Sequence, residues 1–134
     1  NLPPTALPLT GCLSTRKMWI ATLPILSAAG IATAIVPTAI LSTHTGGFKD
    51  YTFRDLTDDI MPIAEHWLTE NIEYDAIYTG YLGSFEQIEI VKRFFELFRK
   101  QNTLIYVDPA MADNGVLYKG FTPEFAKAMA NQWG

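Results

Sequence analysis

Short apolar runs and longer segments with helical spacing alternate along this 134-residue chain. The uncharged run Thr103–Val107 consists of β-branched, aromatic and leucine residues, which is typical of a strand buried on both faces of a parallel sheet. Tyr74–Tyr78 is predicted as a second buried strand, and Ile31–Val36 is a third β-rich run that ends at Pro37. The pattern therefore predicts buried strands, each followed by a loop that contains glycine or polar residues.

Two helices are predicted in the first half of the chain. Met18–Ala29 indicates a buried helix that stops at Gly30, because glycine favours helix C-termini. Phe53–Asn71 carries one apolar face with a spacing of three and four residues, and Asp55 is its candidate N-cap. Between these segments, Ser42–Gly47 is a polar loop that contains glycine. This loop follows the first predicted strand.

Two further helices are predicted in the second half. Ser84–Gln87 matches a capping box, in which the first and fourth side chains bond the backbone at a helix start. The helix that it opens has a broad apolar face made of Phe85, Ile88, Val91, Phe94, Phe95 and Phe98. The last predicted helix, Pro123–Trp133, has Thr122 as its N-cap. Helices thus alternate with strands, which predicts an α/β fold with βαβ units and a mainly parallel sheet.

The N-terminal segment lacks such a pattern. Residues 1–14 contain three prolines among leucine and threonine, so we predict an irregular arm there. We assign residues 1–17 to this arm and residues 18–134 to the folded part.

The segment 18–41 has a second interpretation. It carries no charge and follows two basic residues, a pattern that also fits a signal peptide or a membrane anchor. Pro24, Gly30 and Pro37 interrupt the segment and favour a helix followed by a strand. A secreted or membrane-anchored α/β protein remains the alternative.

Composition restricts the class of protein. With 49% hydrophobic and 18% charged residues the chain is globular, and its net charge of −4 with scattered basic residues argues against a nucleic-acid surface. The single cysteine, Cys12, excludes an intramolecular disulfide and suits a reducing compartment. His44 and His66 lack the spacing of a zinc site.

Candidate chemistry gathers at the predicted strand ends. Asp108 ends the Thr103–Val107 strand and Asp113 follows it, and two acids at the carboxyl edge of a parallel sheet suit Mg²⁺ shared with substrate phosphates. Alternatively, Asp108 only ends the strand and Asp113 forms a turn with Asn114-Gly115. Tyr81, between two glycines, either presents its ring to an aromatic ligand or packs on the next helix.

Three loops carry a resemblance to a known family. His44-Thr45-Gly46, Thr79-Gly80-Tyr81, and Asp108-Pro109 with Asp113 resemble, in order and spacing, loops of the pyridoxal/pyridoxamine kinases of the ribokinase-like superfamily. The resemblance extends from about residue 23 to residue 134. It implies a partial three-layer α/β/α fold with a mainly parallel sheet, of which this chain would be the N-terminal half.

The resemblance also implies roles for individual residues. Thr45 would contact the pyridoxal, and Tyr81 would lie against its pyridine ring. Asp108 would lie at the ATP phosphates and the metal, and Asp113 would help to place Mg²⁺. Where the family usually has glycine before this second aspartate, the chain has Ala112.

The implied activity is ATP-dependent phosphorylation of the 5′-hydroxymethyl group of pyridoxal, pyridoxamine or pyridoxine. ATP and Mg²⁺ are the implied cofactors, with a monovalent cation as a further candidate. The implied parent enzyme is a cytoplasmic homodimer that acts on a small-molecule substrate and binds neither nucleic acid nor membrane. Because the family's catalytic aspartate would lie beyond Gly134, we expect this chain alone to be inactive.

The N-terminus departs from the family. Residues 1–20 do not reproduce its first strand or the serine- and glycine-containing loop that touches pyridoxal, so no substrate serine is assigned. A non-catalytic vitamin-binding module or a structural remnant is therefore the alternative function.

Overall fold

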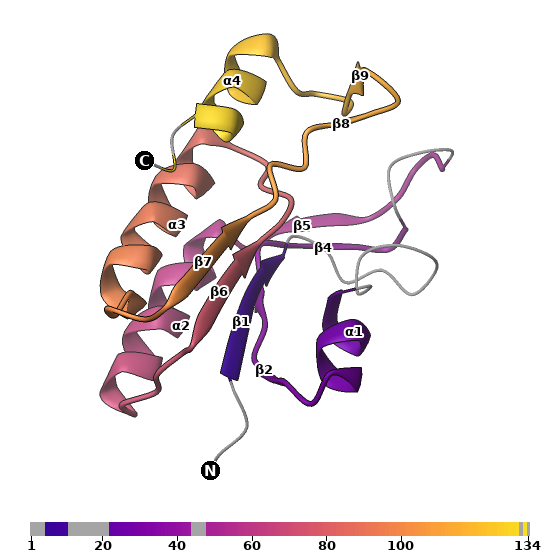
Figure 1. Cartoon of the computed structure of the whole chain (residues 1–134). Coiled ribbons are helices and arrows are strands. Elements are labelled where there is room, and N and C mark those ends of the chain that lie inside the picture. The colour runs from indigo at the N-terminus through magenta and orange to yellow at the C-terminus, as the bar shows by residue number, and fades with distance from the viewer. Residues whose placement is uncertain (1–4, 11–21, 44–47, 132, 134) are drawn as a thin grey trace.

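The computed structural model describes residues 5–10, 22–43, 48–131 and 133, and strands alternate with helices along it (Figure 1). The strands are β1 (Thr5–Thr10), β2 (Ala32–Thr33), β3 (Val36–Pro37), β4 (Ala39–Leu41), β5 (Phe53–Asp55), β6 (Ala76–Thr79), β7 (Leu104–Val107), β8 (Ala112–Asp113) and β9 (Val116–Leu117). The helices are α1 (Thr22–Ala28), α2 (Thr57–Thr69), α3 (Phe85–Phe98) and α4 (Pro123–Asn131).

The main sheet has the strand order β2-β1-β6-β7, and β3 pairs with β1 beyond the end of β2. All strand pairs of this sheet are parallel. Two antiparallel pairs lie apart from it, one formed by β4 and β5 and the other by β8 and β9. The predicted α/β fold with a mainly parallel sheet is therefore confirmed.

β1 lies inside the sheet, between β2 and β6 (Figure 1). Its residues Ala6–Leu9 pair with Ala76–Thr79 of β6. The prediction of an irregular arm is therefore wrong for Thr5–Thr10. Proline is rare in central strands, so the prolines concealed this strand from sequence reasoning. Pro8 removes only its own backbone donor, and the strand still pairs on both sides.

The described part of the segment 18–41 folds as a helix followed by short strands. Gly30 follows α1 with a φ of +76°, so the predicted helix stop is confirmed. The predicted burial is wrong, since α1 has no buried residue and Ile25 is 67% exposed. The single strand predicted over Ile31–Val36 is instead β2 and β3. No helix in the described ranges has both the length and the apolar character that a membrane span requires.

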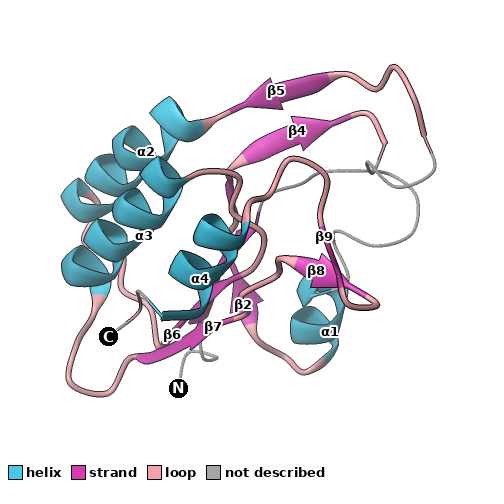
Figure 2. Cartoon of the chain, turned by 90° about the horizontal axis from the view of Figure 1, so that it is seen from above, coloured by secondary structure: helices cyan, strands magenta, loops and turns pink. Residues whose placement is uncertain are grey.

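The main hydrophobic core lies between the sheet and the helices α2, α3 and α4, which cover one of its faces (Figure 2). These helices bury the apolar faces that their sequence periodicity predicts. The buried members of this core are Val36, Ile60, Ala64, Tyr74, Ile77, Leu82, Ile88, Val91, Phe94, Phe95, Phe98, Phe125, Ala128 and Met129.

α2 starts later than the sequence pattern predicts. Phe53–Asp55 forms β5, and the helix begins at Thr57. The N-cap position is Leu56 and not Asp55 as predicted. Asp55 still satisfies a backbone donor at the helix start, because its Oδ1 accepts a 2.8 Å hydrogen bond from the Thr57 N–H.

α3 has its predicted start and nearly all of its predicted apolar face. Ser84 Oγ accepts a 3.1 Å hydrogen bond from the Gln87 N–H, so Ser84 is the N-cap. Phe94 stacks on Phe98 inside the core, with 4.6 Å between ring centroids. Phe85 departs from the prediction, since it is 50% exposed.

The described residues leave much of the opposite face of the sheet uncovered. Leu104 of β7 is 64% exposed and Tyr106 is 59% exposed, so the prediction of a strand buried on both faces is wrong. Tyr78 of β6 points to this open face, because its neighbour Ile77 points into the core and successive side chains of a strand alternate. The rings of Tyr78 and Tyr106 stack there, with centroids 5.6 Å apart.

The titration of the buried Tyr74 makes the stability of the protein depend on pH in the alkaline range. Its side chain is 4% exposed, and burial raises its pKa from 10.0 to about 12. The unfolded chain loses this proton near pH 10 while the folded chain keeps it. The contribution of protonated Tyr74 to the free energy of unfolding is therefore complete below pH 10 and is lost as the pH rises through 12.

We expect the free energy of unfolding to fall between pH 10 and pH 12 by about 2–3 kcal/mol more in the unchanged chain than in Tyr74→Phe. Urea denaturation at a series of pH values measures this difference. Identical pH dependence in the two proteins would contradict it.

Candidate functional site

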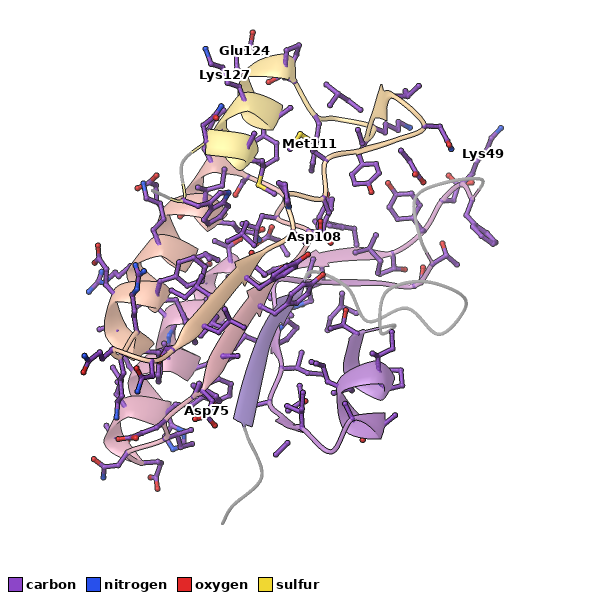
Figure 3. All side chains as sticks on the ribbon, viewed as in Figure 1. Lys49, Asp75, Asp108, Met111, Glu124 and Lys127 are labelled. Carbon is purple, nitrogen blue, oxygen red and sulfur yellow. The ribbon has the colours of Figure 1, made fainter. Side chains whose placement is uncertain are left out.

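Two of the three loops that carry the resemblance begin side by side, at the carboxyl ends of β6 and β7. Thr79 pairs with Val107 in the sheet, and the Asp108 N–H donates a 2.9 Å hydrogen bond to the Thr79 carbonyl oxygen. Figure 3 shows Asp108 at the tip of β7 and Asp75 at the opposite end of the sheet. Ligands of open parallel α/β sheets bind at the carboxyl edge, where Asp108 lies.

The Asp108 carboxylate is exposed and is hydrogen-bonded to a residue of β6. Its Oδ2 accepts a 3.1 Å hydrogen bond from the Tyr78 hydroxyl. Burial raises the pKa of Tyr78, the negative charge of Asp108 raises it further, and a hydrogen bond with Thr22 of α1 opposes the rise. Tyr78 therefore keeps its proton at neutral pH and acts as a donor that orients Asp108.

Asp113 lies on a two-residue hairpin. It pairs with Val116 around Asn114-Gly115, whose φ angles are +49° and +78°. Positive φ at both turn residues is the type I′ geometry that Asn-Gly favours, so the predicted turn is confirmed. Ala112 lies in β8 without a positive φ, so this position does not require the glycine that is usual in the family.

The hairpin returns Tyr118 towards both acids. The Tyr118 N–H donates a 2.9 Å hydrogen bond to the Met111 carbonyl oxygen. Burial raises the pKa of Tyr118, and the charges of Asp113 and Asp108 raise it further. The negative charges of both carboxylates therefore act on this one hydroxyl. Sequence reasoning missed Tyr118, although the Asn-Gly turn indicated that the chain would fold back here.

Tyr81 belongs to an aromatic cluster with Tyr118 and Phe121. Its ring stacks on Phe121 with 5.5 Å between centroids, and the Tyr118 ring is 6.2 Å away. A Cβ added at Gly83 would lie 3.7 Å from the Tyr81 ring, so the ring passes over this glycine. Tyr81 thus packs on the segment before α4. Its contact with a ligand stays a prediction.

The third loop is only partly described. Ser42 closes the β4–β5 pair, since its Oγ accepts a 2.9 Å hydrogen bond from the Thr52 N–H. His44, Thr45 and Gly46 lie outside the described residues, so the substrate contact expected of Thr45 stays a prediction. Cys12 also lies outside the described residues.

Asp108 and Asp113 suit a Mg²⁺ ion that is shared with phosphates. Mg²⁺ usually keeps several water ligands and takes one or two carboxylates from the protein. Both acids are exposed, and the charges of both act on the Tyr118 hydroxyl. In the part of the chain that the structure describes, no group of three or more His, Cys, Asp or Glu side chains could hold a metal. Two carboxylates match the one or two that Mg²⁺ usually takes from a protein.

Several solved kinases share the fold of this chain. A Bacteroides thetaiotaomicron protein assigned as a phosphomethylpyrimidine kinase matches with a TM-score of 0.88 and 40% identity, over 96% of this chain and 45% of its own. Its orthorhombic crystal form with pyridoxal gives a TM-score of 0.84. Pyridoxal kinase from Lactobacillus plantarum matches with a TM-score of 0.81 and 29% identity, over 96% of this chain and 46% of its own.

A more distant kinase shows the same fold. Pyridoxal kinase from Leishmania donovani, in complex with ADP and pyridoxamine, has 20% identity and a TM-score of 0.81, over 94% of this chain and 46% of its own. No protein-family model and no curated protein sequence matches the chain. The expected resemblance is confirmed by the solved structures: the chain has the fold of pyridoxal and phosphomethylpyrimidine kinases and is 40% identical to one of them, and it spans less than half of their length.

Proposed function

We propose that this chain supplies the vitamin-binding half of an ATP-dependent kinase that phosphorylates the 5′-hydroxymethyl group of pyridoxal, pyridoxamine or pyridoxine. The main support is that the Tyr81 loop begins beside Asp108 at the carboxyl edge of the sheet, in a chain 40% identical to a protein crystallised with pyridoxal. An aromatic residue in a loop that begins beside an exposed carboxylate suits a substrate that has an aromatic ring and receives a phosphate group.

Each site residue has a role in this proposal. Tyr81 offers its ring to the pyridine ring, and Thr45 contacts the vitamin from its own loop. Asp108 and Asp113 hold Mg²⁺ at the ATP phosphates, where the ion neutralises negative charge. Charge stabilisation and positioning are the main requirements of phosphoryl transfer. Tyr78 keeps the Asp108 carboxylate oriented through their hydrogen bond.

Phosphoryl transfer needs more protein than these 134 residues. The matched kinases are more than twice as long as this chain. Leu104 and Tyr106 form an apolar patch on the open sheet face, and β7 is an edge strand of the described sheet. Proteins normally cover such faces and edges. We propose that a polypeptide equivalent to the rest of those kinases covers this face, and that the chain alone transfers no phosphate above background.

The test is complementation with the part of the Bacteroides thetaiotaomicron protein that this chain does not match. The two polypeptides are produced together, and the absorbance of pyridoxal 5′-phosphate formed from pyridoxal and ATP is followed. We expect turnover by the pair and only background rates for either polypeptide alone. Turnover by the 134-residue chain alone would contradict the need for a second half. Failure of the two polypeptides to copurify would contradict the proposal that the second one covers the open sheet face.

Phosphomethylpyrimidine kinase activity is the second candidate, because the 40% identical protein carries that assignment. The completed enzyme distinguishes the two activities through kcat/KM measured with pyridoxal and with the pyrimidine. A higher value for the pyrimidine would replace the vitamin B6 assignment. A pair that copurifies and binds pyridoxal without transferring phosphate would support the non-catalytic, vitamin-binding alternative.

Replacing Tyr81 by alanine is expected to weaken pyridoxal binding to the chain about tenfold, because the pyridine ring loses its aromatic partner. Isothermal titration calorimetry measures the affinity. The control Tyr81→Phe keeps the ring, and its affinity should stay within roughly twofold of the unchanged chain. Equal affinities for the alanine and phenylalanine variants would exclude the Tyr81 ring from the binding site.

A further inference from the structure

The Gln87 side chain does not complete the capping box that the sequence predicts. In a capping box it would accept a hydrogen bond from the backbone of the N-cap residue, Ser84. Instead, Gln87 Oε1 accepts a 2.8 Å hydrogen bond from the Gly83 N–H. Gln87 Nε2 donates to Thr57 Oγ1 at 2.9 Å and to the Thr38 carbonyl oxygen at 3.3 Å. The residue is 2% exposed, so this amide is buried and fully paired.

The three partners of Gln87 belong to three different parts of the fold. Gly83 ends the loop that carries Tyr81, and the Tyr81 ring passes over it. Thr38 joins β3 to β4, the strand that leads towards Thr45. Thr57 is the first residue of α2. One side chain of α3 therefore connects the Tyr81 loop to the start of β4, the strand that precedes the Thr45 loop.

We propose that Gln87 is a positioning residue, which fixes the Tyr81 loop relative to the strand that leads to Thr45 and so sets the affinity for the B6 vitamer. This inference rests on the proposed function. A buried hydrogen bond is costly to leave unmade, so the amide holds its partners at one separation. Because Gly83 lies only two residues from Tyr81, a displaced Gly83 displaces the ring.

The chemistry of the three partners selects glutamine at this position. They present one N–H donor and two oxygen acceptors, and an amide offers one oxygen acceptor with two N–H donors. Leucine has a similar size but can pair with none of them. A carboxylate could accept from Gly83 but would face the Thr38 carbonyl oxygen without a proton to donate.

The test compares variants of the 134-residue chain that remove these bonds with one that only weakens the core. Gln87→Leu removes all three bonds, and Thr57→Val removes one of them and serves as the milder change should Gln87→Leu not fold. The control, Val91→Ala, makes a cavity under the same helix and leaves the amide intact, since Val91 is fully buried in the core. Amide hydrogen exchange at Gly83, pyridoxal affinity and thermal stability are measured for each.

We expect Gln87→Leu to speed exchange at Gly83 about tenfold and to weaken pyridoxal binding about tenfold, and Thr57→Val to change both by roughly threefold. Val91→Ala should lose thermal stability, while its exchange rate at Gly83 and its pyridoxal affinity stay within about twofold of the unchanged chain. Unchanged amide exchange at Gly83 in both Gln87→Leu and Thr57→Val would overturn the proposal. Faster exchange at Gly83 with unchanged pyridoxal affinity would also overturn it. If the unchanged chain binds no pyridoxal, the proposed function fails, and exchange at Gly83 alone then decides whether Gln87 positions this loop.

Discussion

Replacing Phe94 by alanine is expected to lower the free energy of unfolding by about 3–5 kcal/mol. Phe94 is fully buried in the core between the sheet and the helices, and its ring stacks on Phe98. The substitution removes apolar area and leaves a cavity that the close-packed surroundings fill only in part. Because small domains are stable by only about 5–15 kcal/mol, much of the total stability is expected to be lost.

Urea denaturation followed by tryptophan fluorescence measures this loss as a lower midpoint at an unchanged slope. Leu97→Ala on the same helix is the control, since Leu97 is 38% exposed and its truncation should cost about 1 kcal/mol or less. A similar loss in the two variants would show that the core does not depend on Phe94 as its packing indicates.

Replacing Asp108 by asparagine is expected to lower kcat of the complemented kinase about 100-fold. The change keeps the shape of the side chain and still offers an oxygen to the Tyr78 hydroxyl, so the loop should keep its path. It removes the negative charge that the proposal assigns to the metal ion at the ATP phosphates. The loss should therefore appear in kcat and in a higher Mg²⁺ concentration for half-maximal rate.

Glu96→Gln is the matched control, because it removes one negative charge from the exposed side of α3 and leaves the sheet edge intact. Its kcat should equal that of the unchanged protein within about twofold. If Asp108→Asn kept full activity with the same Mg²⁺ requirement, Asp108 would be only a strand-ending residue, which is the alternative that the sequence left open.

Local rules made several elements predictable from the sequence. The apolar spacing of α3 marked most of its buried face, and Ser84 marked its start. Asn114-Gly115 marked a turn, because few other residue pairs accept two successive positive φ angles. The carboxyl-edge position of Asp108 followed from the strand before it. These features depend on residues that are close together in the chain.

Other features depend on partners that are distant in the chain. β1 contains Pro8, which argues against a strand, and its pairing with both β2 and β6 places it in the sheet. The apolar run of β7 could not show that only one of its faces would be covered by the described helices. The Tyr78 hydroxyl meets Asp108 across neighbouring strands, a contact that depends on sheet register.

By itself, the sequence determined the type of most elements, the α/β class and the loops that carry the resemblance to pyridoxal kinases, because periodicity and turn chemistry act within a few residues. Only the tertiary structure decided that the charges of Asp108 and Asp113 both act on the Tyr118 hydroxyl, and that Gln87 bonds Gly83, Thr38 and Thr57. The partners of Gln87 at Thr38 and Thr57 are 49 and 30 residues away. No local pattern specifies such contacts, since they form only when the sheet and helices pack together.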